Sequence, residues 1–308
     1  MHITGLEALV FGVEDMAASR QYLLDYGLTE VEFGANGGRF ESLDGGAIVL
    51  RHASDPGLPA LKHRSPCLRE TVWGVRDAAG LAQIAAELSK DRDVTTDADN
   101  TLHSSDDGGF ALAFQLTQAR TIVAQPVGIN VPGQAHGRPI NHTGADPGEV
   151  ILPRALSHVV YFVPDAVKAE AFYAERLGFR TTDRFIGIGP FMRPAGLLEH
   201  HCLFMIQSFN PHMAGMNHFT FHVADAGELL HSGWRFAQKG YKSFWGPGRH
   251  IMGSNYFWYF NSPFGGTMEY DADMDLHDDT WQPRAMPMGK DSSQIFLFES
   301  RDKWAPGG

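Results

Sequence analysis

The sequence repeats its own pattern in two halves, and this duplication limits the folds that the chain can adopt. Each matched segment reads as a strand of alternating residues, and two of the three are followed by the start of a helix. The matched segments are LEALVFGVED at 6–15 with LSHVVYFVPD at 156–165, LRETVWGVRDA at 68–78 with MNHFTFHVADA at 216–226, and DDGGFALAF at 106–114 with SPFGGTMEY at 262–270. We therefore expect two duplicated α+β domains, each built from two strand–helix–strands modules.

The helices and the domain boundaries follow from the same alignment. Helices are expected to end at Gly27 and Gly178, and further helices near 79–89 and 226–239 are expected to start at Asp-Ala pairs. Residues 118–154 are rich in Pro, Gly, Asn and His without clear periodicity, which predicts a long connection that wraps the surface. The predicted units are an N-terminal domain at 1–117, this connection, a C-terminal domain at 155–290, and a tail at 291–308 that packs on its own domain.

Composition excludes several classes of protein. The chain has 308 residues, of which 43% are hydrophobic and 20% charged, so packed cores for two domains are possible. Its net charge of −11 argues against a nucleic-acid partner. No apolar run approaches the roughly 20 residues that span a bilayer, and the N-terminus does not read as a secretory signal. The two cysteines, Cys67 and Cys202, form no disulfide framework, so we expect a cytoplasmic protein.

The stretch at 246–273, GPGRHIMGSNYFWYFNSPFGGTMEYDAD, indicates a chemical site. We expect it to begin with a Gly-Pro turn and His250, to continue as an aromatic strand at 256–260, and to return as a strand that carries Glu269. A carboxylate among apolar and aromatic neighbours is costly to bury unless it is paired or bound to a metal. Glu269 is therefore a candidate metal ligand.

Comparison of the two halves separates candidate ligands from residues that the fold requires. Three polar residues of the second half align with different residues in the first half: His158 with Ala8, His218 with Glu70, and Glu269 with Ala113. The apolar pattern around them is the same in both halves, so the fold does not require these side chains. Alternation along three strands can turn two imidazoles and one carboxylate to a common side, which is the facial triad of non-haem Fe(II) sites.

Two alternatives compete with this interpretation of the histidines. A single strand histidine is more often a hydrogen-bonded core residue than a metal ligand. His222 shares a face with His218 and is a rival ligand, although we expect it to line the pocket or to support the ligands.

These residues resemble a known family along essentially the whole chain. The pattern Gly248-Arg249-His250, then Tyr259, Pro263, Gly265 and Glu269, is similar to the signature of two-domain extradiol ring-cleaving dioxygenases, of the catechol or 2,3-dihydroxybiphenyl type, in the vicinal oxygen chelate superfamily. The resemblance implies that each domain forms a curved mixed sheet around a central pocket. Two positions depart from the usual pattern, Trp258 and Ser262, and they lie where substrate choice is expected to differ.

The resemblance also implies an activity and its residues. It implies His158, His218 and Glu269 as ligands of Fe(II), with Mn(II) the less expected metal, and O₂ as co-substrate. A catechol ring would open beside its two hydroxyls, as in bacterial aromatic catabolism. Within the strand expected at 199–205, His201 is the implied acid–base catalyst, and His200 is the alternative because neighbouring strand residues point opposite ways.

Tyr259 and His250 are implied to hydrogen-bond the substrate oxygens, although Tyr259 could equally be a core residue of an aromatic strand. The partners expected are a small aromatic diol and further copies of the chain in a homo-oligomer, without nucleic acid or membrane. A glyoxalase-like or isomerase-like enzyme and a non-catalytic ligand-binding protein of the same superfamily are the alternatives.

The wall of the pocket is predicted from two apolar segments. These are 185–194, FIGIGPFMRP, and 209–213, FNPHM. Arg193 or Arg249 could bind a carboxylate of the substrate, but arginines of this kind more often form structural ion pairs.

Overall fold

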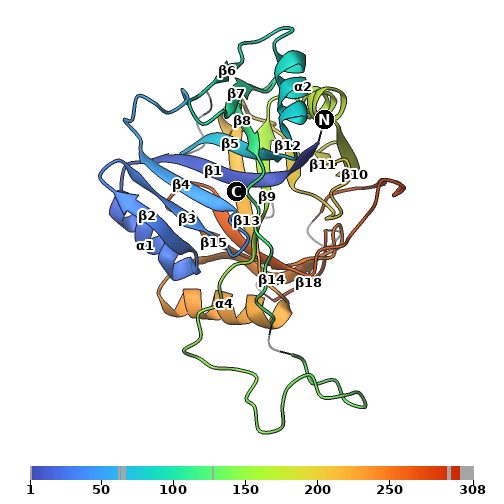
Figure 1. Ribbon diagram of the computed structural model, residues 1–308. Helices are drawn as coiled ribbons and strands as arrows, with labels where there is room; N and C mark the ends of the chain where they lie inside the picture. The colour runs from blue at the N-terminus through green and yellow to red at the C-terminus, as the bar shows by residue number, and fades with distance from the viewer. Residues whose placement is uncertain (1, 62, 64–66, 127, 290–292, 299–308) are drawn as a thin grey trace.

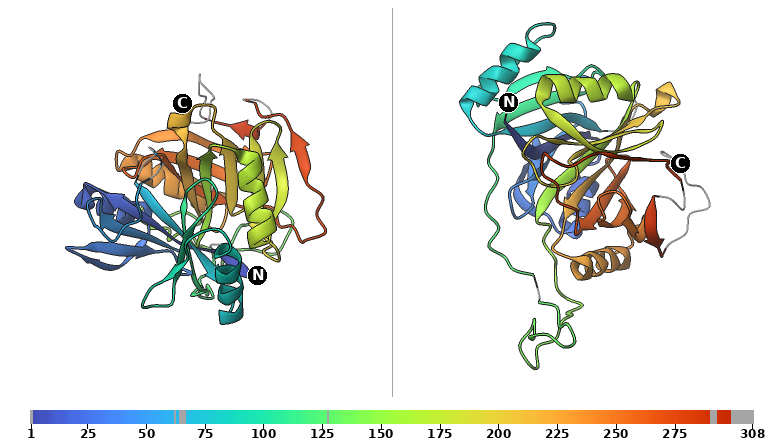
Figure 2. Two further views of the ribbon diagram at one scale, coloured as in Figure 1. Left: turned by 90° about the horizontal axis from the view of Figure 1, so that it is seen from above. Right: turned by 90° about the vertical axis from the view of Figure 1, so that its right-hand side faces the viewer.

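Two β-sheets pack against each other in the computed structural model, which describes residues 2–61, 63, 67–126, 128–289 and 293–298 (Figure 1). The first half forms an 8-stranded sheet of order β2-β3-β4-β1-β5-β8-β7-β6. The second half forms a 10-stranded sheet of order β17-β10-β11-β12-β9-β13-β16-β15-β14-β18. Helices cover only a small part of each sheet, so the predicted α+β fold of two duplicated domains is confirmed (Figure 2).

The first sheet and its two helices account for the chain up to residue 116. Its elements are β1 Ile3–Val13, α1 Met16–Tyr26, β2 Thr29–Gly34, β3 Gly37–Glu41, β4 Ala47–His52, β5 Leu68–Val75, α2 Ala78–Leu88, β6 Thr95–Thr96, β7 Leu102–Ser105 and β8 Ala111–Leu116.

The second sheet begins at residue 155 and repeats this order with additions. Its elements are β9 Ala155–Val163, α3 Ala166–Ala171, the π-helical turn η1 Phe172–Arg176, β10 Phe179–Phe185, β11 Gly189–Pro194, β12 Leu203–Gln207, the 3₁₀ turn η2 Pro211–Met213, β13 Gly215–His222, α4 Ala226–Gln238, β14 Ser243–His250, β15 Tyr256–Asn261, β16 Thr267–Ala272, β17 Arg284–Met286 and β18 Gln294–Leu297.

The duplication seen in the sequence is also present in the strand register. β1 pairs antiparallel with β5, which pairs parallel with β8; β9, β13 and β16 repeat this arrangement. The equivalent pairs are Val10 with Glu70 and Val72 with Ala113 in the first sheet, and Val160 with His218 and Thr220 with Glu269 in the second. Residues that the sequence alignment equates therefore occupy equivalent places in the two sheets.

Aspartate caps start the helices where the sequence predicts them. The Asp77 carboxylate accepts a hydrogen bond from the backbone N–H of Gly80 at 2.8 Å, and Asp225 accepts one from Glu228 at 2.9 Å. Gly27 ends α1 with φ = 113°, a left-handed conformation that glycine adopts without a steric penalty. Gly178 also has positive φ, but there α3 first widens into the π-helical turn η1.

Two local predictions in the second half are wrong. The expected Gly246-Pro247 turn lies inside β14, where the register against β15 shifts between Trp245 and Gly248, so a bulge accommodates the proline within a strand. Glu199, His200 and His201 precede β12 and do not lie in a strand. Glu199 forms an isolated bridge with Leu276, and the His200 N–H donates to the Asp275 carbonyl at 2.9 Å.

The connection between the two halves extends away from the sheets, whereas the segment after residue 273 packs on the second sheet. The described part of 117–154 contains no helix or strand, and its middle extends past α4 away from both sheets, so it does not wrap the surface as predicted (Figures 1 and 2). The segment after residue 273 returns to its own sheet, as expected. β17 pairs parallel with β10, and β18 pairs antiparallel with β14. Residues 291–292 and 299–308 of the predicted tail lie outside the described residues.

One hydrophobic core joins the two sheets. Phe11 of β1 packs against Phe219 of β13, with ring centroids 5.2 Å apart. Tyr26, the last residue of α1, stacks on Tyr270 of β16 at 3.9 Å, and its hydroxyl donates to the Glu269 carbonyl at 2.5 Å. The first half therefore directly supports the strand that carries Glu269. No described helix is long and apolar enough to span a membrane.

Candidate metal centre

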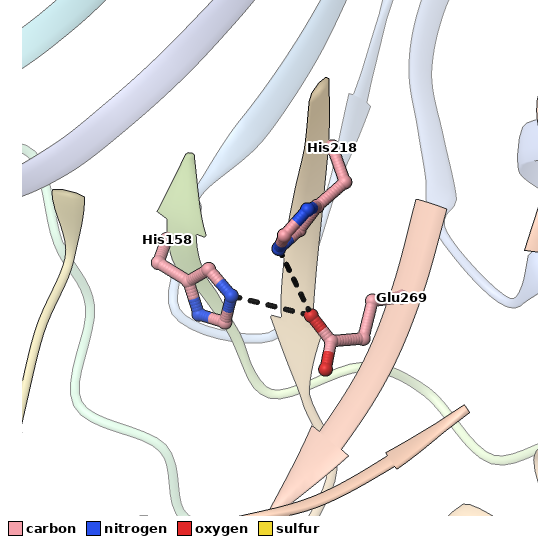
Figure 3. A group of neighbouring side chains, drawn as sticks. All are labelled: His158, His218 and Glu269. Atoms are coloured by element: carbon pink, nitrogen blue, oxygen red, sulfur yellow. Dashed lines mark ion pairs between the residues drawn. The ribbon is translucent and has the colours of Figure 1, made fainter. Parts of the chain in front are cut away.

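Three neighbouring strands bring His158, His218 and Glu269 together (Figure 3). The Glu269 Oε2 lies 3.2 Å from the His158 Nε2 and 3.5 Å from the His218 Nε2. One ligand atom from each residue lies within 4.8 Å of the others, a spacing that could hold a metal ion. The side chains converge because β9, β13 and β16 are consecutive in the sheet and each residue points to the same face.

Burial makes this group of side chains suited to a cation. Glu269 is 0% exposed, and its Oε1 has no hydrogen-bond partner among the described residues. Burial raises the pKa of Glu269, and burial together with the nearby His158 lowers the pKa of His218 well below its usual value. A buried carboxylate oxygen without a hydrogen-bond partner beside two imidazoles fits a divalent metal, and this donor set is one that Fe(II) uses.

Polar neighbours hold the two imidazoles in orientation. The Ser157 hydroxyl lies 2.9 Å from the His158 Nδ1 and donates to Asp271 at 3.2 Å, while the Asn217 Oδ1 lies 2.5 Å from the His218 Nδ1. With each Nδ1 engaged in this way, each Nε2 faces Glu269, an arrangement common around metal-binding histidines. Thr220 donates to the Glu269 Oε2 at 2.5 Å.

His222 does not join the group. Its Nδ1 lies 2.5 Å from Asp271 and its Nε2 lies 3.4 Å from Glu199. Although burial opposes the charge, these two carboxylates raise the pKa of His222 well above its usual value. Protonated and paired in this way, His222 supports Asp271 and does not line the cavity.

The equivalent place in the first half is filled by small apolar side chains. Ala8, Ala47, Val72 and Ala113 form a buried cluster there, and Glu70 instead binds His103 at 2.8 Å. Within the described part of the chain, the second half alone carries the candidate metal group.

A cavity of about 470 Å³ opens beside the candidate metal centre. Its polar lining includes His158, His218, His201, His250 and Tyr259. Its apolar lining includes Val160, Phe162, Phe185, Phe191, Phe204, Ile206, Met213, Met252 and Met288. Both predicted wall segments therefore contribute to the cavity.

The two arginines proposed as substrate partners do not line this cavity. Arg193 is 1% exposed and binds Asp279 at 2.9 Å and the Leu197 carbonyl at 2.5 Å. Arg249 binds Asp273 at 2.8 Å. Both form structural ion pairs.

The two unusual positions of the signature also lie away from the cavity. Trp258 points to the other side of β15, where its indole N–H donates to Ser243 at 3.0 Å and its ring lies over Gly233 of α4. The Ser262 hydroxyl donates to the Gly265 carbonyl within the turn at 3.1 Å. Neither side chain lines the cavity, so direct contact with a bound ligand does not support a role for these two positions in substrate choice.

Of the remaining residues predicted from the sequence, His201, His250 and Tyr259 line the cavity and His200 does not. His201 lines the cavity, whereas His200 is 0% exposed and points away from it to Asp183, 2.8 Å from its Nε2. The Tyr259 hydroxyl and the His250 Nε2 are 3.3 Å apart at the cavity. Burial, reinforced by the Glu269 charge, raises the pKa of Tyr259 well above its usual value, and burial lowers the pKa of His250 to about 3. Tyr259 is thus a neutral donor, and His250 is a neutral ring.

Sequence reasoning missed several polar residues around the site. Thr220 and Asp271 share strand faces with predicted ligands, a periodicity that could have marked them. Asn255 lines the cavity and is 1% exposed, but it follows a turn and has no aligned counterpart that would single it out. Asp183 lies far from the other residues in sequence and carries no local signal.

Comparisons with known proteins agree with this geometry. Residues 155–270 match the model of the Glyoxalase/Bleomycin resistance protein/Dioxygenase superfamily. Metapyrocatechase 2 of Cupriavidus necator is 34% identical over 178 residues, which are 57% of this chain and 52% of that protein. The match thus spans about half the length of that relative. Biphenyl-2,3-diol 1,2-dioxygenase of Paraburkholderia xenovorans (strain LB400) is 28% identical over 91% of both chains.

A solved structure shares the fold. The Mn(II)-bound glyoxalase from Novosphingobium aromaticivorans superposes with a TM-score of 0.74 at 19% identity, covering 94% of this chain and 89% of that one. The duplicated sheets, the group of two histidines and one glutamate, and the match to residues 155–270 lead to one conclusion. Residues 155–270, and with them the candidate metal centre, are similar to the Glyoxalase/Bleomycin resistance protein/Dioxygenase superfamily.

Proposed function

We propose that the protein is an Fe(II)-dependent extradiol dioxygenase, which opens the ring of a catechol beside its two hydroxyls and adds both atoms of O₂. The observation that carries the proposal is a buried His158, His218 and Glu269 group that opens onto a cavity lined by further imidazoles and a tyrosine. The names of the two curated relatives support the same reaction class. A bound Fe(II) would supply Lewis acidity towards the diol and electron transfer to O₂.

The side chains around the cavity have distinct tasks in this proposal. His158, His218 and Glu269 would hold the metal on one face and leave the cavity side open. Tyr259 and His250 lie side by side at the cavity, where the tyrosine O–H can donate a hydrogen bond to a substrate oxygen and the neutral His250 can accept a hydrogen bond from one. His201 lies on the same side and would hold or donate the proton that the opening ring product requires.

The lining of the cavity indicates which catechols fit. No lysine or arginine is among the described residues that line it, and many of its lining residues are aromatic, aliphatic or methionine. A carboxylate on the substrate would be desolvated there without a cation to pair with it. We therefore propose an uncharged catechol with an apolar substituent as the substrate class.

Anaerobic purification and reconstitution test this function. The protein is loaded separately with Fe(II) and with Mn(II), and O₂ uptake and formation of the yellow ring-opened product are followed with catechol, an alkyl or phenyl catechol, and a carboxylated catechol. We expect Fe(II)-loaded protein to cleave the apolar catechols best. Stoichiometric Fe(II) without turnover of any diol would exclude the dioxygenase reaction.

A further inference from the structure

His201 is connected through buried polar side chains to β10, beside the edge strand β17 of the second sheet. Its Nδ1 lies 2.9 Å from the Nδ1 of His200, and the Nε2 of His200 lies 2.8 Å from the Oδ2 of Asp183. Both His200 and Asp183 are 0% exposed, and His201 is 4% exposed. Neither His200 nor Asp183 lines the cavity, so neither can touch a substrate directly.

Asp183 is fixed from its other side. Its Oδ1 accepts the backbone N–H of Arg284 at 2.8 Å, and the Arg284 guanidinium donates to its Oδ2 at 2.6 Å. Although burial opposes it, these bonds and the one from His200 lower the pKa of Asp183 to about 2. The carboxylate is therefore an acceptor only, and the Nε2 of His200 must carry a proton to donate to it.

The protonation of His200 on Nε2 in turn determines which nitrogen of His201 carries a proton. Burial lowers the pKa of His200 in spite of Asp183, so its ring is neutral and holds one proton. With that proton on Nε2, its Nδ1 is a bare acceptor, and the 2.9 Å contact requires the Nδ1 of His201 to donate. Among the described residues, none hydrogen-bonds the Nε2 of His201, which is left with its lone pair as the free nitrogen of a cavity-lining ring.

We propose that Asp183 and His200 are positioning residues that fix the tautomer and the ring orientation of His201, so that an unprotonated Nε2 faces the substrate. The inference rests on the proposed function for its catalytic consequence, but the tautomer is a property of the protein alone. Positioned in this way, the unprotonated Nε2 of His201 can accept a hydrogen bond from the bound diol.

Substitution of Asp183 by asparagine is expected to move the ring proton of both His200 and His201 to the other ring nitrogen. In Asp183→Asn, we expect the amide oxygen to replace Oδ1, which the fixed backbone N–H of Arg284 contacts. The amide NH₂ then faces His200, and the partly exposed Arg284 guanidinium turns away from it. That NH₂ needs a bare Nε2 on His200, so the Nδ1 of His200 becomes the donor and the proton of His201 moves to Nε2. Arg284→Gln is the matched control, because it removes the guanidinium but leaves the carboxylate and the backbone N–H in place.

The test reads the tautomer directly, by ¹⁵N–¹H NMR of histidine-labelled, metal-free protein. We expect His201 to be protonated on Nδ1 in the wild type and in Arg284→Gln, and on Nε2 in Asp183→Asn. His200→Asn, whose amide oxygen can replace the Nδ1 acceptor, should keep the wild-type tautomer, whereas His200→Leu should not. A wild-type His201 protonated on Nε2, or an Asp183→Asn protein with the wild-type tautomer, would overturn the proposal.

Steady-state kinetics of the Fe(II)-loaded protein distinguish a positioning role of Asp183 from a nonspecific structural effect of its substitution. Asp183→Asn should lower kcat by about 10- to 100-fold, the usual range for residues that orient a functional side chain, with the KM for the catechol and the iron content unchanged. Equal losses in Arg284→Gln and Asp183→Asn would contradict a specific role for the carboxylate. Wild-type protein that shows the expected tautomer and cleaves no catechol would contradict the proposed function alone.

Discussion

Glu269 is the residue on which the candidate metal centre depends most directly. It is fully buried, its Oε1 has no hydrogen-bond partner among the described residues, and its Oε2 faces both imidazoles. Glu70 offers a natural comparison, because it is also a buried strand carboxylate but belongs to the half without the two histidines.

Glu269→Gln should abolish stable metal binding. The amide keeps the shape of the side chain but removes the negative charge that offsets a divalent cation. Since residues that only orient ligands change affinity by 10- to 100-fold, loss of the anionic ligand should weaken binding by at least about 100-fold. Metal titration followed by calorimetry measures the change. Glu70→Gln should bind like the wild type, and a comparable loss in that control would refute the assignment to the second half.

At the scale of elements, strand alternation assigns neighbouring side chains of β15 to different environments. Tyr259 faces the cavity beside His250, whereas Trp258 faces α4. The same alternation turns His158 on β9 and His218 on β13 towards Glu269 on β16.

Tyr259→Phe should reduce turnover while Trp258→Phe leaves it near the wild-type value. Removal of the hydroxyl deletes a neutral donor aimed at the cavity, and a hydrogen bond to a charged oxygen contributes about 1.5–3 kcal/mol, or about a 10- to 100-fold change in kcat. Steady-state kinetics with a saturating apolar catechol measures the effect. If Trp258→Phe proved as damaging as Tyr259→Phe, the hydroxyl would have no special role.

The limits of sequence reasoning are also clearest at this scale. The convergence of His158, His218 and Glu269 was predictable because strand alternation places each of them on one face and both copies keep one apolar pattern. The bulge at Gly246-Pro247 was not, since it depends on pairing with β15 and β18 on either side. Likewise, Asp183 and Arg284 meet only because β17 returns to the edge of the sheet beside β10, a contact without any local signature.

On the scale of the whole molecule, the first half acts as a support for the second. Tyr26 ends α1, and its hydroxyl donates a hydrogen bond to the Glu269 carbonyl. The Tyr270 hydroxyl donates a hydrogen bond to the Tyr26 carbonyl at 2.7 Å. These reciprocal bonds join the halves directly behind the candidate metal centre. The half without ligands thus contributes to the geometry of the half with them.

Tyr26→Phe should lower the stability of the protein and loosen the metal site together. The substitution leaves the stacked ring in place but removes the donor to a buried carbonyl, which costs about 1–3 kcal/mol. Urea unfolding of metal-free protein measures the loss, and metal affinity should fall in the same variant. Tyr256→Phe, on the β15 edge away from this contact, is the control and should leave metal affinity unchanged. Unaltered affinity in Tyr26→Phe would show that the two halves are mechanically independent at the site.

Asp106 gives the contact between the halves a pH dependence. Its carboxyl group accepts the backbone N–H of Phe110 at 2.9 Å and faces the Tyr173 hydroxyl of the other half at 3.2 Å, and burial raises its pKa to about 6. Because the folded protein holds this proton more tightly than the unfolded chain, the stabilisation is complete below pH 4 and is lost as the pH rises towards 6.

The difference in unfolding free energy between the wild type and Asp106→Asn isolates the titration of Asp106, because the pH-dependent contributions of the other groups are the same in both proteins and cancel. A shift of about two pH units corresponds to about 3 kcal/mol, so the wild type should lose up to that amount relative to Asp106→Asn between pH 4 and pH 7. Urea unfolding of the metal-free proteins at several pH values measures it. A difference that stays constant with pH would mean that Asp106 is ionised in the folded protein throughout this range, and that the two halves meet there through a charged carboxylate.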